Sequence, residues 1–211
     1  EAFRPSNQDW EKRIIERGFN DALSQSAQNI AAAIMVKKYS ANSISNSVSI
    51  LTVSDSRTSV DDKSGDILIE RLTHAGHKLI DRALVKDDEA MIVKKLKKWI
   101  YDPIVEVVIS TGGTGVTGRD VTPEAFMQVY EKEITGFGEV FRQISYDIIG
   151  TSAIQSRATA GVAGGTYLFA LPGSPSACRD GWDHILKDQL DVRFRPCNFA
   201  ELIPRLQEGD A

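Results

Sequence analysis

The feature that most constrains the fold is a strand, a glycine-rich loop and a helix in immediate succession. The apolar, β-branched run at residues 104–109 predicts a buried strand. Residues 112–115 then hold three glycines, and Thr122-Pro123 predicts a helix start, with threonine as N-cap and proline in the first turn. This order indicates a β-loop-α unit, so an α/β fold is expected.

The side chains of this loop indicate a site for an anion. Glycines let backbone N–H groups face a ligand without a Cβ in the way, and the following helix dipole favours negative charge. Thr111 and Thr114 add hydroxyl donors, while Arg119 and Asp120 add a phosphate-pairing cation and a carboxylate. The glycines could instead serve only to turn a corner, but a plain turn does not need these polar groups. The loop lacks the Gly-Lys-Ser/Thr ending of a P-loop and the glycine spacing of a dinucleotide fingerprint, which weakens an ordinary ATPase or nicotinamide interpretation.

Composition narrows the possible partners. The 211 residues are 42% hydrophobic, enough for one substantial core, and the net charge of −4 supports neither a nucleic-acid nor a membrane partner. The two cysteines fit a reducing cytosol, so a cytoplasmic location is expected. The three histidines form no metal-ligand cluster, so a metal would be a hard cation held by carboxylates; His74 and His77 are expected on the surface.

The chain divides into three parts by composition. Residues 1–45 are expected to be an extension and polar linker, residues 46–206 one domain, and residues 207–211 a tail. Within the domain, predicted strands and helices alternate, which indicates a mostly parallel sheet covered on both faces. The expected strands are 48–54, 79–85, 104–109 and 167–171, and the expected helices are 61–75, 88–100, one from Pro123, 138–149 and 175–190.

Polar loops follow four of the predicted strands. They are residues 54–57, 86–88, 111–115 and 172–175. In open α/β sheets, ligands bind beyond the carboxyl ends of the strands. The four loops are therefore expected to form one site.

Six short segments, specific in combination, identify a resemblance to a known family. They are residues 51–55, 111–115, 119–124, 136–139, 142–145 and 171–175. Together they resemble the MoaB/Mog family of molybdenum-cofactor biosynthesis, whose active members are molybdopterin adenylyltransferases. The resemblance covers residues 48–206, and residues 177–179 and 195–199 are similar to the MoaB branch in particular.

The resemblance implies a three-layer α/β/α sandwich, like that of molybdopterin-binding domains, assembled as a homotrimer or homohexamer. It implies that the terminal phosphate of molybdopterin attacks the α-phosphate of Mg-ATP, which gives adenylylated molybdopterin and pyrophosphate. Mg²⁺ would be the cofactor, and molybdopterin and ATP the substrates. Other proteins of the pathway are further possible partners.

The resemblance also assigns site residues. The catalytic carboxylates, which are also the metal ligands, fall on Asp87 and Asp120, although Asp88 and Glu89 leave open which acid near residue 87 acts. The residues expected to bind substrate are Ser54, Asp55, Thr111, Gly112, Gly113, Thr114, Gly115, Arg119, Pro172, Gly173, Ser174 and Pro175.

Two other functions remain open from the sequence. The chain could bind molybdopterin, or assemble with pathway partners, without transferring AMP. It could also be a hydrolase or ligase that acts on another phosphorylated nucleotide. The paired acids Asp87 and Asp120 favour the enzyme over the binding protein.

Overall fold

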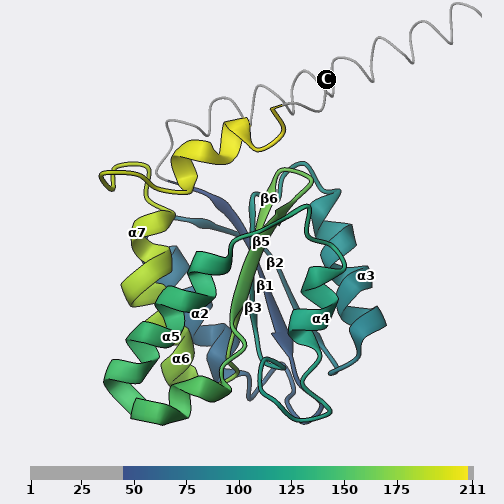
Figure 1. Ribbon diagram of the computed structural model, residues 1–211. Helices are drawn as coiled ribbons and strands as arrows, with labels where there is room; N and C mark the ends of the chain where they lie inside the picture. Colours follow the sequence, from purple (N-terminus) through teal and green to yellow (C-terminus); the bar gives the residue numbers. More distant parts are fainter. Residues whose placement is uncertain (1–44, 209–211) are drawn as a thin grey trace, which may run out of the picture. The chain divides into compact units, whose positions relative to one another are not determined.

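A six-stranded sheet forms the centre of the described part of the protein, which is residues 45–208 of the computed structural model. The strand order is β2-β1-β3-β6-β5-β4 (Figure 1). β2, β1, β3 and β6 are parallel, while β5 and β4 run antiparallel at one edge. The strands are β1 (Ser47–Val53), β2 (Lys78–Val85), β3 (Val107–Thr111), β4 (Lys132–Glu133), β5 (Thr159–Ala163) and β6 (Thr166–Leu171).

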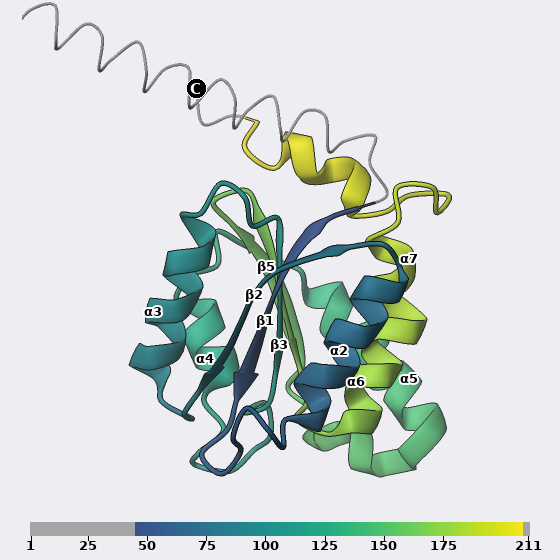
Figure 2. The same cartoon turned by 180° about the vertical axis from the view of Figure 1, so that it is seen from behind.

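Helices cover both faces of the sheet. α3 (Glu89–Ile100) and α4 (Thr122–Met127) lie on one face. The opposite face carries α2 (Lys63–His74), α5 (Thr135–Ile149), α6 (Pro175–Gly181) and α7 (Lys187–Gln189), as both views show (Figures 1 and 2). Shorter helical segments are η1 (Gly150–Gln155), the π-helical turn η2 (Trp182–Leu186) and η3 (Ala200–Arg205). The predicted three-layer α/β/α sandwich is confirmed.

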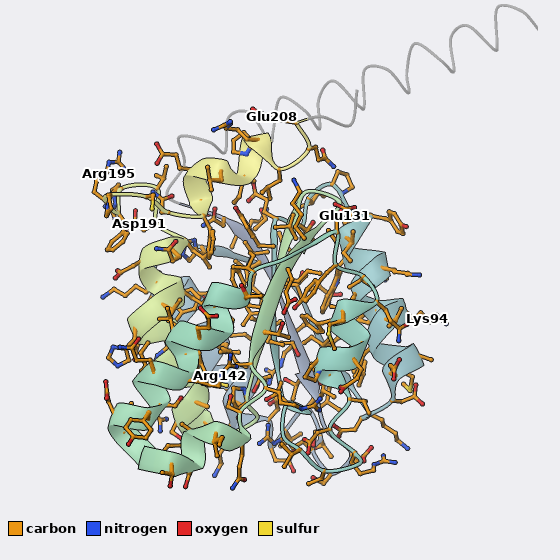
Figure 3. All side chains as sticks on the ribbon, in the orientation of Figure 1. Lys94, Glu131, Arg142, Asp191, Arg195 and Glu208 are labelled. Carbon is orange, nitrogen blue, oxygen red and sulfur yellow. The ribbon has the colours of Figure 1, made fainter. Side chains whose placement is uncertain are left out.

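The spacing of apolar residues along a helix explains how it packs on the sheet. On α3, Ile92, Leu96 and Trp99 fall at helical spacing and are buried against the sheet. Lys94 lies on the outer side of the same helix, away from the sheet (Figure 3). Burial of each large apolar side chain contributes about 1.5–3 kcal/mol. Lys94, Lys97 and Lys98 therefore form its solvated face, whereas Lys95 pairs with Asp81 of β2 and lies over the Trp99 ring.

The structure corrects three expectations from the sequence. The third strand begins at Val107 rather than at residue 104, and Ile104 is 55% exposed. Thr122 is not the N-cap of α4: the cap is Val121, and the Thr122 hydroxyl instead donates a hydrogen bond to the Gly112 carbonyl (2.8 Å). His77 is buried rather than on the surface. Its Nδ1 is satisfied there by a hydrogen bond that it accepts from the Asn46 backbone N–H (3.1 Å).

The antiparallel edge strands were not expected. β5 is rich in small residues, which have low β-propensity. A packing constraint accounts for one of them: a Cβ at Gly161 would lie 2.3 Å from the Tyr130 ring. The edge of the sheet is thus shaped by a tertiary contact that periodicity does not show.

Predictions for the two termini lie outside the described residues, including nearly all of the extension at 1–45 and residues 209–211 of the tail. Within residues 45–208, no helix combines the length and apolar character needed to cross a bilayer.

The two cysteines are expected to differ sharply in reactivity. Cys178 is buried, and burial raises the pKa of its thiol to about 11, whereas Cys197 is exposed. Native protein at pH 7.5 should therefore take up one equivalent of iodoacetamide rapidly, and unfolded protein two. Mass spectrometry of the labelled peptides measures how much of each cysteine has reacted. Rapid labelling of Cys178 in the native protein would contradict its burial.

Candidate functional site

The four parallel strands bring the predicted loops to one edge of the sheet. Thr52 of β1 pairs with Thr111 of β3, which pairs with Leu171 of β6, and Val53 pairs with Val85 of β2. All four strands therefore end at the same level, at the lower edge of the sheet in Figure 1. The loops that follow line a cavity of about 560 Å³. The four loops therefore lie together around one cavity, as expected from the sequence.

Backbone geometry explains the glycines of the loop. Gly112 has φ +103°, and a Cβ there would lie 2.1 Å from the Val53 carbonyl oxygen. Gly113 has φ +63°, and its Cβ would lie 2.4 Å from the Thr122 hydroxyl and 2.9 Å from an Asp87 carboxylate oxygen. Only glycine fits both the conformation and the space. The chain thus passes very close to one of the predicted catalytic carboxylates.

Arg157 holds the far side of this loop. Its guanidinium donates to the Gly115 carbonyl (2.6 Å), to the Asp120 carbonyl (2.6 Å) and to the Glu124 carboxylate. Its backbone N–H donates to the Thr114 carbonyl (2.9 Å). One side chain therefore ties the glycine loop to the segment that carries Asp120.

Replacing Arg157 by methionine should loosen this loop. The change removes the guanidinium bonds but keeps an unbranched chain, and we expect the free energy of unfolding to fall by about 2 kcal/mol, since hydrogen bonds to charged groups contribute this order of energy. Urea unfolding checks the value. Arg193→Met is the matched control, because Arg193 pairs only with nearby Asp191 at the surface and should cost about 0.5 kcal/mol or less. Equal losses in the two variants would contradict the role of Arg157.

Asp87 and Asp120 both line the cavity, but their environments differ. Burial and the neighbouring carboxylates of Asp55 and Asp120 raise the pKa of Asp87 above its ordinary value. Burial acts in the same direction on Asp120, but hydrogen bonds from the hydroxyl (2.6 Å) and N–H (2.9 Å) of Thr117 outweigh it and lower its pKa. The ionised form of Asp120 is thus stabilised, whereas burial and the neighbouring carboxylates outweigh the attraction of Arg119 and disfavour the ionised form of Asp87.

The structure distinguishes Asp87 from its two acidic neighbours. Asp88 is the N-cap of α3, and its carboxylate accepts a hydrogen bond from the Met91 N–H (2.8 Å). Glu89 accepts a hydrogen bond from Gln128, the C-cap residue that follows α4. Of the three acids, only Asp87 lines the cavity.

Asp55 and Arg119 form an ion pair across two loops. The Arg119 hydrogen bond lowers the pKa of Asp55, and the same carboxylate accepts a hydrogen bond from the Asp87 N–H (3.3 Å). Arg119 lines the cavity, whereas Asp55 does not. The Arg119 side chain is 70% exposed, so an anionic ligand can compete with Asp55 for its guanidinium.

The fourth loop is held by its backbone. The Gly173 carbonyl accepts hydrogen bonds from the Ser64 hydroxyl (2.7 Å) and the Arg57 guanidinium (2.7 Å). Ser174 is the N-cap of α6, where its hydroxyl accepts a hydrogen bond from the Ala177 N–H (3.1 Å). This loop is therefore fixed next to the glycine loop, with Gly173 packed against Gly112.

Most residues predicted to bind substrate lie at the cavity wall. Three residues do not line the cavity. Asp55 forms an ion pair with Arg119, and Pro175 is the first residue of α6. The hydroxyl of Thr111 is buried and donates a hydrogen bond to the Pro172 carbonyl (3.0 Å). Those at the wall are Ser54, Gly112, Gly113, Thr114, Gly115, Arg119, Pro172, Gly173 and Ser174.

A second wall was missed from the sequence. It comes from α5, η1 and α6. On α5, the four lining residues follow the i, i+4, i+7, i+8 spacing of one helix face, a signal that could have pointed to this wall. They are Phe141, Ser145, Ile148 and Ile149.

The donor set suits a cation that shares its coordination with phosphate. Residues 45–208 contain no group of three or more acidic, histidine or cysteine side chains that could hold a metal alone. Mg²⁺ in nucleotide sites commonly uses one or two carboxylates together with water and substrate phosphates. Asp87, which has no cationic partner at hydrogen-bond distance in this part of the chain, fits that pattern.

Comparisons with known proteins agree with this geometry. Residues 49–192 match the family described as "probable molybdopterin binding domain". Molybdenum cofactor biosynthesis protein B of Escherichia coli K12 is 49% identical over 152 residues, which are 72% of this chain and 89% of that protein. The corresponding Bacillus cereus protein is 45% identical over 142 residues, 67% of this chain and 84% of that protein.

Solved structures show the same fold. A crystal structure of a molybdenum cofactor biosynthesis protein B superposes with a TM-score of 0.68 at 44% identity, and covers 69% of this chain and 91% of that one. The tungsten cofactor synthesizing protein MoaB from Pyrococcus furiosus gives a TM-score of 0.62 at 35% identity, with 68% and 92% covered.

Proposed function

This chain belongs to the "probable molybdopterin binding domain" family, and we propose that it acts in molybdenum cofactor biosynthesis as a molybdopterin adenylyltransferase. In the proposed reaction, an oxygen of the terminal phosphate of molybdopterin attacks the α-phosphate of ATP. The bond to the β-phosphate breaks, so adenylylated molybdopterin and pyrophosphate are released.

The observation that carries the proposal is the position of two carboxylates around one glycine loop. A Cβ at Gly113 would lie 2.9 Å from the Asp87 carboxylate, and a Cβ at Gly115 would lie 2.7 Å from that of Asp120. Nucleotidyl transfer requires a protein mainly to align phosphates and to neutralise their charge. A protein that only bound a pterin would not need paired acids facing an anion loop.

The chain's own groups have separate tasks in this proposal. The loop at 112–115 receives phosphate, and Arg119 exchanges its contact with Asp55 for one with the ligand, which places positive charge where negative charge develops. Asp87 and Asp120 would hold Mg²⁺, which when bound neutralises phosphate oxygens and aids departure of pyrophosphate. Arg157 and Thr117 keep Asp120 in place.

AMP transfer from α-labelled ATP to molybdopterin tests the proposal. Labelled pterin product and pyrophosphate should appear in equal amounts, and EDTA should stop both. Tight molybdopterin binding without product would contradict the enzyme and support the alternative, a non-catalytic binding or assembly protein of the same pathway. Pyrophosphate released without a pterin product would instead indicate hydrolysis of another nucleotide.

We also propose a homo-oligomer, a trimer or a hexamer. Large apolar side chains are exposed on α5 and on η1, where Ile154 is 83% exposed. Light scattering should give three or six times the mass of one chain, and a single-chain mass across micromolar concentrations would contradict this. The other exposed apolar residues of these elements that do not line the cavity are Val140 and Tyr146.

A further inference from the structure

One carboxylate at the cavity wall has no role in the proposed transfer. Asp180 lies on α6, is half-buried and lines the cavity. Within residues 45–208, its carboxylate takes part in no hydrogen bond and no ion pair. By contrast, Asp183, in the segment that follows α6, pairs with Arg71 outside the cavity. A carboxylate at the cavity wall that has no donor from the protein is free to accept hydrogen bonds from a ligand.

The surroundings of Asp180 suit a flat ring. α5 and α6 lie side by side on the same face of the sheet (Figures 1 and 2). α5 contributes Phe141, Ile148 and Ile149 to the cavity, and α6 contributes Ala177 one turn before Asp180. Ile148 and Ile149 are each more than half exposed, although they border the cavity. α5 and α6 therefore bring apolar surface, the hydroxyls of Ser145 and Ser176 and the Asp180 carboxylate to the same cavity as the glycine loop and Arg119.

The chemistry of a carboxylate distinguishes between the two rings that must be bound. An ionised carboxylate only accepts hydrogen bonds, and it can accept two parallel ones. The 2-amino-4-oxopyrimidine edge of a pterin presents two adjacent N–H donors, from the 2-amino group and N3. Adenine presents an N–H donor next to a ring nitrogen acceptor, so it can satisfy only one carboxylate oxygen and places a lone pair against the other.

We propose that Asp180 is a specificity-determining residue that accepts both N–H groups of the pterin edge, while the ring lies against Ile148 and Ile149. The choice of a pterin as ligand rests on the function proposed above. The phosphate end of the ligand then lies at the glycine loop, and the ring end lies between α5 and α6.

The test compares two ligands that differ at the recognised edge. They are 6-hydroxymethylpterin monophosphate and 6-hydroxymethyllumazine monophosphate, in which a carbonyl replaces the 2-amino group. The unaltered protein should bind the pterin about 10- to 100-fold more tightly, the factor expected for a hydrogen bond to a charged group. Asp180→Asn presents one acceptor and one donor, which match the lumazine edge, so the preference should reverse. Affinity for Mg-ATP should not change.

Asp183→Asn is the matched control, since it removes the same charge from the neighbouring segment and should leave the ligand preference intact. Equal affinity of the unaltered protein for the two ligands would overturn the proposal without any variant. A loss of ATP affinity in Asp180→Asn that matches or exceeds the loss for the pterin would also overturn it. Failure of AMP transfer with the pterin preference intact would refute the transferase and leave the role of Asp180 standing.

Discussion

Replacement of Asp87 by asparagine is expected to lower kcat for AMP transfer by about 100- to 1,000-fold, the cost of removing one preorganised electrostatic contact to a transition state. The same change should slightly raise the melting temperature. Burial and nearby carboxylates raise the pKa of Asp87, which means that its ionised form destabilises the folded state near pH 7. Removing the charge therefore relieves the repulsion between carboxylates, although it lowers the rate of AMP transfer.

Asp88→Asn provides the matched control for this prediction. It removes the same charge one residue along, and asparagine is as good an N-cap as aspartate, so α3 should keep its cap. Activity and stability should both stay close to those of the parent protein. Full activity in Asp87→Asn, or equal losses in the two variants, would show that Asp87 does not act at the phosphates. Steady-state kinetics and differential scanning calorimetry supply both readouts.

Replacement of Gly112 by alanine is expected to destabilise the fold by about 3 kcal/mol, from a disallowed backbone conformation together with a steric clash. The φ of +103° is accessible only to glycine, and the added Cβ would meet the Val53 carbonyl oxygen at 2.1 Å. Since Gly112 also accepts the Thr122 hydroxyl bond and packs against Gly173, the two loops should separate. Ligand binding should be lost together with stability.

Gly136→Ala is the appropriate comparison. Gly136 lies in the first turn of α5, has no positive φ and has no atom within 4 Å of an added Cβ. Alanine there should be neutral or stabilise the protein by about 0.5–1 kcal/mol, because glycine loses more conformational freedom on folding. Urea unfolding measures both variants, and a Gly112→Ala protein as stable as Gly136→Ala would contradict the geometry of the loop.

The parallel half of the fold could be predicted because its signals are local. β-branched runs such as β3, helical spacing on α3 and the Ser174-Pro175 helix start are all encoded within a few residues. Because ligands bind at the carboxyl ends of parallel strands, the sequence alone was enough to predict that the loops after these strands lie together. The antiparallel edge could not be predicted, because the small residues of β5 have low β-propensity and the contact of Gly161 with the distant Tyr130 ring forms only in the folded chain.

The cavity was predicted only on the side of the glycine loop, for a related reason. Glycines and paired acids carry a local signature, whereas Ser145 and Ile149 resemble ordinary helix residues until α5 is placed beside the loops. Arg157 likewise acts only because folding brings it to the Gly115 carbonyl, 42 residues away in sequence. The capping of α4 could not be predicted for the same reason, because the Thr122 hydroxyl donates to the carbonyl of Gly112 and not to a group of its own helix.

In the proposed reaction, one cavity holds both substrates, with their phosphates at the glycine loop between Asp87 and Asp120. A crystal structure with molybdopterin, Mg²⁺ and a non-hydrolysable ATP analogue tests it most directly. We predict that the molybdopterin phosphate and the α-phosphate lie within about 3–3.5 Å of each other beside residues 112–115, a distance suited to attack, with the metal on the two carboxylates. Ligand density elsewhere, or a pterin phosphate far from both carboxylates, would contradict the account.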